Sequence, residues 1–139
     1  MPDVPRVRPC RRRSPNCVST RSTGRRHGAD PIPFTGPVAD AQERLRRALA
    51  TLPRITLVAE GPGWLRAEAR TRLGFVDDLE IEIEQEPDPA TGEPAGRIHF
   101  RSAARTGWWD LGVNRRRTEA LRRAFFFLGG LFKPPAPRE

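Results

Sequence analysis

The residues best suited to chemistry gather in one run near the C-terminus, from residue 101 to residue 117. The run combines five arginines with Asp110, Asn114, two glycines and two tryptophans. It spans the end of a predicted strand, a turn and the start of a predicted helix. Backbone N–H groups, a helix dipole and fixed side chains can converge there on an anion. The run therefore predicts where a site would lie, without naming its ligand.

Asp77 and Asp78 form the second candidate group. Strand alternation sends Asp78 to solvent and Asp77 toward the core. A buried carboxylate without a partner is strongly unfavourable, so Asp77 needs an arginine or the backbone N–H groups of the turn at 106–114. Two interpretations stay open: a structural latch that fastens strand to loop, or a carboxylate that faces a ligand pocket with a perturbed pKa.

The predicted helix start after Gly112 is the third candidate group. Asn114 is a good N-cap and Asp110 an alternative one. Three arginines, Arg115 to Arg117, then occupy the first turn, where the helix dipole disfavours cations. Carboxylates such as Asp77 and Asp110 can compensate, or an external anion can, or the arginines simply face solvent. Of Trp108 and Trp109, we expect one to enter the core and the other to cover a loop or line a cleft.

Other chemistries find little support. Cys10, Cys17, His27 and His99 could supply four metal ligands in number, but their spacing matches no zinc template. We expect neither a metal nor a cofactor. A Cys10–Cys17 disulfide is not expected in a reducing cytoplasm, although the flexible segment would permit one. No Gly-x-Ser-x-Gly elbow, P-loop or His-Glu-x-x-His motif is present, so catalysis is the minority interpretation.

The net charge of +8 is unevenly distributed. Residues 1–27 hold eight arginines against Asp3, which leaves the remaining residues close to neutral. Such a tail can bind nucleic acid or anionic lipid weakly, but no nucleic-acid-binding signature accompanies it, and specific nucleic-acid binding is not expected. No apolar run is long enough to span a membrane, and no secretory apolar region is visible. We therefore expect a cytoplasmic protein.

Periodicity predicts an α+β domain that positions these residues. A helix over 37–52 is followed by four strands and by a helix over 114–128 that Gly129-Gly130 ends. The strands are expected at 54–60, 64–71, 75–84 and 97–105. The order α-β-β-β-β-α implies a four-stranded antiparallel sheet with both helices on one face. Residues 14–132 would form the domain, between flexible tails at 1–13 and 133–139; composition alone predicts that residues 1–35 are extended or disordered unless they dock.

The last two strands predict their own register. One alignment pairs opposite charges outside and apolar residues inside. It matches Glu84 with Arg97, Ile83 with Ile98, Glu82 with His99, Ile81 with Phe100, Glu80 with Arg101 and Leu79 with Ser102. The same register sets Asp77 opposite Ala104 on the buried side.

Three stretches together resemble the bacterial and plastid family known as domain of unknown function 1499. They are Ser-Pro-Asn-Cys-Val-Ser-Thr at 14–20, Phe-Val-Asp-Asp-Leu-Glu at 75–80, and Arg-Ser-Ala-Ala-Arg through Asp-Leu-Gly-Val-Asn-Arg at 101–115, with Arg117. Ala104 and Thr20 depart from the serines usual in the family. The resemblance implies no reaction, but it implies that residues 14–20 belong to the domain and dock near Asp77, Asp78 and the 101–114 run. Relatives often carry an export or membrane-anchoring segment.

The sequence thus favours a small soluble binding or interaction domain whose polar site holds an anionic group of a small molecule or a protein partner. The candidate binding residues are Asn16, Cys17, Asp77, Asp78, Arg101, Ser102, Arg105, Asp110, Asn114, Arg115 and Arg117. The alternative is a small enzyme with Cys17 as nucleophile or Asp77 as general base beside an arginine clamp. A purely structural role for these residues is the third interpretation.

Overall fold

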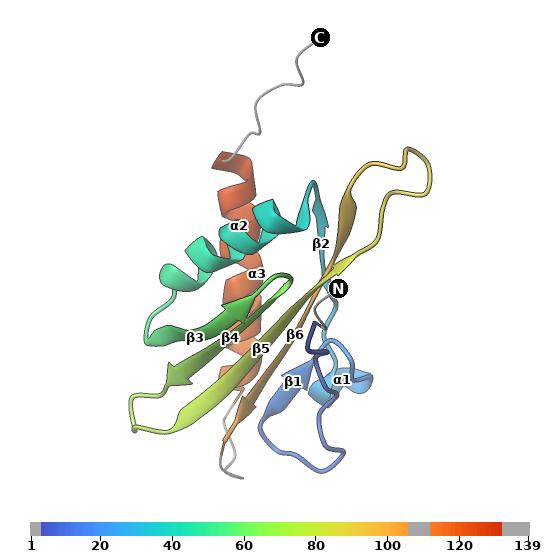
Figure 1. Ribbon diagram of the computed structural model, residues 1–139. Coiled ribbons are helices and arrows are strands. Elements are labelled where there is room, and N and C mark those ends of the chain that lie inside the picture. Colours follow the sequence, from blue (N-terminus) through green and yellow to red (C-terminus); the bar gives the residue numbers. More distant parts are fainter. Residues whose placement is uncertain (1–3, 106–111, 132–139) are drawn as a thin grey trace.

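The computed structural model describes residues 4–105 and 112–131 (Figure 1). Its elements in chain order are β1 (Cys17–Ser19), α1 (Gly24–His27), β2 (Ile32–Thr35), α2 (Val38–Ala50), β3 (Ile55–Gly61), β4 (Trp64–Arg70), β5 (Val76–Gln85), β6 (Ala95–Ala104) and α3 (Val113–Leu131). The strands join in one sheet of order β1-β6-β5-β4-β3, and β2 also pairs with β6. All of these ladders are antiparallel.

The predicted α+β class with an antiparallel sheet is confirmed, whereas the predicted counts of four strands and two helices are wrong. The described residues hold six strands and three helices. The missed elements are β1, α1 and β2, each three or four residues long. Segments this short are too brief to show a hydrophobic period, and they lie in a stretch rich in arginine and proline.

The predicted register between β5 and β6 is confirmed along its whole length. Glu84 pairs with Arg97, Ile81 with Phe100, and Asp77 with Ala104. Alternation therefore sends odd-numbered residues of β5 toward the helices and even-numbered ones to the opposite face. In β3 a bulge between Leu57 and Ala59 breaks this alternation.

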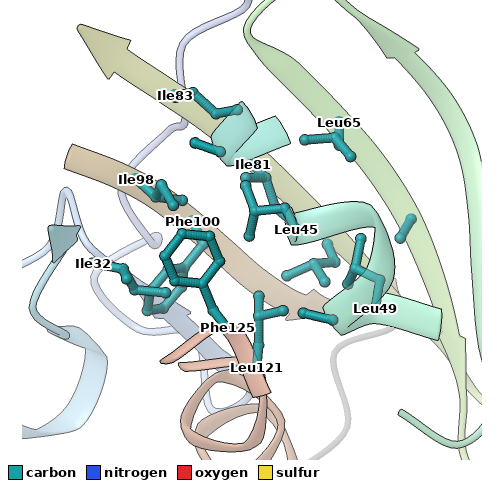
Figure 2. Close-up of a cluster of buried hydrophobic side chains, with 14 of the residues drawn as sticks. Ile32, Leu45, Leu49, Leu65, Ile81, Ile83, Ile98, Phe100, Leu121 and Phe125 are labelled. Carbon is teal, nitrogen blue, oxygen red and sulfur yellow. The ribbon is translucent and has the colours of Figure 1, made fainter. Parts of the chain in front are cut away.

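The hydrophobic core lies between the inner face of the sheet and helices α2 and α3 (Figure 2). Leu45 of α2 and Leu121 and Phe125 of α3 meet Ile81 and Phe100 of the central strands, and all five are almost fully buried. Burying side chains of this size contributes about 1.5–3 kcal/mol each, which makes this layer the main source of stability.

The prediction that Gly129-Gly130 ends the last helix is wrong, since α3 continues to Leu131. Gly129 instead makes room for Arg44 of α2, because a Cβ there would overlap the Arg44 guanidinium. Arg44 donates from Nε to the carbonyl oxygen of Phe125 at 2.6 Å and stacks 3.6 Å above the Phe125 ring. The glycine is explained by helix packing rather than by helix termination.

The N-terminal segment docks on the opposite, outer face of the sheet. Val7 is buried and its backbone N–H donates to Glu82 Oε1 at 2.8 Å. Arg8 and Arg21 reach Glu80 and Glu82 of β5 at 3.2 and 3.0 Å. The docking of residues 14–20 expected from the family resemblance is confirmed, because β1 pairs Cys17 with Ala103.

Candidate functional site

The sheet divides the sequence-predicted site residues into two groups on opposite faces. Asp77, Ser102 and Asn114 lie on the inner, buried side together with Arg117. Asp78, Arg101 and Arg105 lie on the outer side, where they line a cleft. A single site that contains both groups is therefore excluded by the pleat of β5 and β6.

The inner group is built on a buried ion pair. Arg117 of α3 places Nη1 2.8 Å from Asp77 Oδ2, and the two side chains are only 10% and 3% exposed. The same Nη1 donates to Asn114 Oδ1 at 2.9 Å. The partner required by a buried carboxylate is thus an arginine from the last helix.

Asn114 ties three segments together. Its Oδ1 accepts a hydrogen bond from Ser102 Oγ of β6 at 2.6 Å, and its Nδ2 donates to the carbonyl oxygen of Asn16 at 3.0 Å. That carbonyl also accepts from the backbone N–H of Ala104 at 3.0 Å. The segment before β1, the end of β6 and the start of α3 are therefore fastened at one buried point. The geometry is that of the latch interpretation.

Asn114 does not cap the helix, because α3 begins at Val113 and the side chain of Asn114 is used in the latch. Arg115, the next residue, donates from Nη2 to the carbonyl oxygens of Arg25, Arg26 and Gly28 at 2.9–3.2 Å. Carbonyl dipoles and the carboxylate of Asp77 therefore offset the positive charge at this helix start. Asp110, Trp108 and Trp109 lie outside the described residues.

The outer group lines a cleft of about 710 Å³ between the N-terminal segment and strands β3 to β6. Six arginines and two carboxylates contribute to its walls: Arg8, Arg11, Arg13, Arg66, Arg101, Arg105, Asp78 and Glu80. Ser14 and Asn16 of the N-terminal segment lie along the same cleft. The walls thus carry an excess of positive charge.

The two carboxylates that line the cleft already form ion pairs with arginines. Glu80 has Arg8, Arg66 and Arg101 within 3.2–3.7 Å. Asp78 accepts two hydrogen bonds from Arg105 at 2.7 and 3.2 Å, and these bonds raise the pKa of Arg105.

Arg11 and Arg13, by contrast, make no ion pair with any described residue, and their side chains are exposed. Two of the six guanidinium groups along the cleft are therefore available to a ligand without breaking an existing contact.

Arg101 is the most unusual of these side chains. It is only 14% exposed, and its buried Nε has no hydrogen-bond partner among the described residues. Burial lowers the pKa of this guanidinium, and repulsion from Arg8 and Arg11 lowers it further, while Glu80 opposes the shift. A desolvated cation with an unused donor is stabilised by an anion placed beside it.

Cys17 is joined to Cys10 by a disulfide, with the two Cα atoms 5.8 Å apart. The sequence-based expectation of no disulfide is therefore wrong. In this oxidised form Cys17 has no thiol and cannot act as a nucleophile. Asp77, the other catalytic candidate, is 2% exposed and paired with Arg117.

Sequence reasoning missed four arginines of the cleft. Arg66 could have been predicted from the sequence, because alternation along β4 sets it on the same face as Glu80, its cross-strand partner. Arg8, Arg11 and Arg13 lie in a segment without hydrophobic periodicity, so no pattern indicated where they would dock.

The fold and these contacts define a small α+β domain with a buried polar latch on one face of its sheet and an arginine-lined cleft on the other. The chain belongs to the family described as protein of unknown function (DUF1499), whose model matches residues 6–125. A comparison with curated proteins finds no match.

Within residues 4–105 and 112–131, no helix is long and apolar enough to cross a lipid bilayer. Across the same ranges, no group of three His, Cys, Asp or Glu side chains is arranged to hold a metal ion.

Proposed function

We propose that this protein is a binding domain that holds a multiply charged oxyanion, such as a phosphate or sulfate group, in the outer cleft. The observation that carries the proposal is Arg101, a largely buried guanidinium whose Nε donor lacks a partner among the described residues. Guanidinium groups bind phosphate and carboxylate oxygens through pairs of hydrogen bonds, and these bonds strengthen where water is excluded.

The charge of the cleft supports a ligand with more than one negative charge. Asp78 and Glu80 offset only two of the six guanidinium groups along its walls. A singly charged anion would leave most of the excess in place. A phosphate monoester, pyrophosphate or sulfated group would neutralise more of it, and Arg11 and Arg13 can contact such a ligand while Asp78 and Glu80 keep their partners.

The inner group supports a structural role instead. Arg117 forms an ion pair with Asp77 across the interface between strand and helix and donates a hydrogen bond to Asn114 of its own helix. We therefore assign Arg101, Arg105 and Asn16 of the sequence-predicted residues to ligand binding, together with Arg8, Arg11 and Arg13, while Asp78 holds Arg105 in place. The remaining described candidates hold the fold around the cleft.

The test is a thermal-shift panel of phosphate, pyrophosphate, sulfate and citrate at constant ionic strength. It compares the wild type with Arg101→Gln and Arg13→Gln. Arg12→Gln is the matched control, because Arg12 lies on the same exposed loop and carries the same charge but does not line the cleft. We expect at least one multivalent anion to raise the melting temperature of the wild type and of Arg12→Gln.

Both cleft variants should weaken this response, Arg101→Gln by roughly tenfold in apparent affinity, which corresponds to the loss of one charge-assisted contact of about 1.4 kcal/mol. Raising the ionic strength should weaken binding as well. A flat panel, or equal responses from all four proteins, would refute the proposal and direct the search to protein partners.

A further inference from the structure

We infer that the Cys10–Cys17 disulfide positions the arginines of the loop that it closes over the outer cleft, so that reduction of the disulfide weakens anion binding there. The inference rests on the proposed function of the cleft and adds its regulation. It joins two observations, the bond between the two sulfur atoms and the residues that line the cleft.

The disulfide closes the loop that forms one wall of the cleft. Cys10 and Cys17 are seven positions apart in sequence, and the bond holds their Cα atoms 5.8 Å apart. Between them lie Arg11, Arg13 and Ser14, which all line the cleft, followed by Pro15 and Asn16, which line it too. The cross-link therefore fixes the path of the chain along this wall of the cleft.

The two halves of this loop are held differently. The second half is anchored without the disulfide: the carbonyl oxygen of Asn16 accepts two hydrogen bonds, and that of Ser14 lies 2.6 Å from His27 Nε2. In the first half, the side chains of Arg11 and Arg13 make no hydrogen bond or ion pair with the described residues. The backbone there is held by the bond from Ser14 N–H to the carbonyl oxygen of Arg11 and by the anchorage of Cys10.

Cys10 itself is anchored by two contacts. Its backbone N–H donates to Ser22 Oγ at 2.8 Å, and its sulfur is bonded to Cys17, which β1 fixes against β6. Breaking the disulfide leaves one of these contacts. The loop that carries Arg11 and Arg13 then samples more conformations, and ordering it again on ligand binding opposes binding.

A dithiol of the thioredoxin type can reduce the Cys10–Cys17 disulfide by thiol–disulfide exchange. One thiolate of the reductant attacks the sulfur of Cys10, whose residue is half-buried whereas Cys17 is buried. A mixed disulfide forms and Cys17 leaves as a thiolate, which takes up a proton. The second thiol of the reductant displaces Cys10. Two electrons and two protons pass to the protein, and the reductant becomes a disulfide.

The experiment titrates inorganic pyrophosphate into the full chain by calorimetry, at one ionic strength, with and without dithiothreitol. We expect reduction to weaken binding by the wild type roughly three- to tenfold, as for two displaced exposed charges. Cys10→Ser/Cys17→Ser should bind like the reduced wild type, with or without dithiothreitol. Equal affinity in the two redox states of the wild type would overturn the inference while leaving the proposed function intact.

Arg11→Gln/Arg13→Gln keeps the disulfide and tests the same coupling should the serine variant fail to fold. Its affinity should match that of the reduced wild type, and dithiothreitol should change it little. Affinity equal to that of the oxidised wild type would overturn the inference. Absence of binding of every anion of the thermal-shift panel by the oxidised wild type would overturn both the inference and the proposed function, whereas equal affinity in the two redox states overturns the inference alone.

Discussion

Among single residues, the clearest contrast is between two adjacent aspartates of β5, which have opposite environments. Asp77 is buried against Arg117, whereas Asp78 is half-exposed and pairs with Arg105, which also lines the cleft. Strand alternation predicted which of the two is buried, and the need of a buried carboxylate for a partner predicted an arginine or a turn. Only the tertiary structure shows that the arginine comes from a helix forty positions later in the chain.

Asp77→Asn should lower the free energy of unfolding by about 3 kcal/mol, because the buried Arg117 would lose its counter-charge. Asp78→Asn is the matched control and should lower it much less, since that ion pair is exposed to solvent. Urea unfolding monitored by circular dichroism measures both values. Equal losses in the two variants would contradict the latch.

His99 should make stability depend on pH. Burial lowers the pKa of His99 from its usual 6.5, and Arg21 and Arg97 lower it further against the opposing charges of Glu84 and Glu82. The unfolded chain therefore binds a proton more readily than the folded protein, so stability is full above pH 6.5 and falls as the pH drops through the folded-state pKa.

Melting temperatures measured between pH 8 and pH 5 test this, with His99→Gln as the control. The wild type should lose stability relative to the variant as the pH falls, because only in the wild type does unfolding expose an imidazole that then takes up a proton. A stability difference between the two proteins that is constant across this range would contradict the prediction.

At the scale of elements, periodic segments were predictable and short segments were not. The helices α2 and α3, the strands β3 to β6 and the β5–β6 register follow from hydrophobic period and cross-strand charge pairing. β1 and β2 are strands only because each pairs with β6, over three and four residues respectively. Their pairing depends on long-range contacts that leave no local pattern.

Gly96 shows how closely the elements approach at this edge. A Cβ on Gly96 would lie 2.0 Å from the backbone carbonyl oxygen of Glu84 and 2.7 Å from the ring of Phe34. Gly96→Ala should therefore lower the free energy of unfolding by about 2–3 kcal/mol, as expected for overpacking between two strands. Chemical unfolding measures the change, and a loss below about 0.5 kcal/mol would show that β2 and β5 can move apart freely.

At the scale of the whole molecule, the basic N-terminal segment is part of the folded structure. Its arginines explain the net charge of +8, and two of them neutralise glutamates on the outer face of the sheet. The sequence predicted the charge asymmetry but not its destination. Disulfides persist in oxidising compartments and are rare in a reducing cytoplasm, and the cytoplasmic location expected from the sequence stays a prediction.

Removal of residues 1–9 should destabilise the protein by about 2–4 kcal/mol. The truncation removes the buried Val7 and leaves the buried Glu82 without the N–H of Val7. Both domain boundaries remain predictions, and this truncation tests the first of them. If residues 1–13 form a flexible tail, the melting temperature of the truncated protein will match that of the full chain.

A titration followed by nuclear magnetic resonance distinguishes a structural latch on one face of the sheet from an anion-binding cleft on the other. Inorganic pyrophosphate is added to the isotopically labelled full chain, and the backbone amide signals are followed. We expect saturable shifts confined to residues that line the cleft, at positions 8, 11, 13, 14, 16, 58, 66, 67, 78–80, 101 and 103–105. Shifts centred on Asn114 and Arg117, or none that saturate, would contradict this expectation.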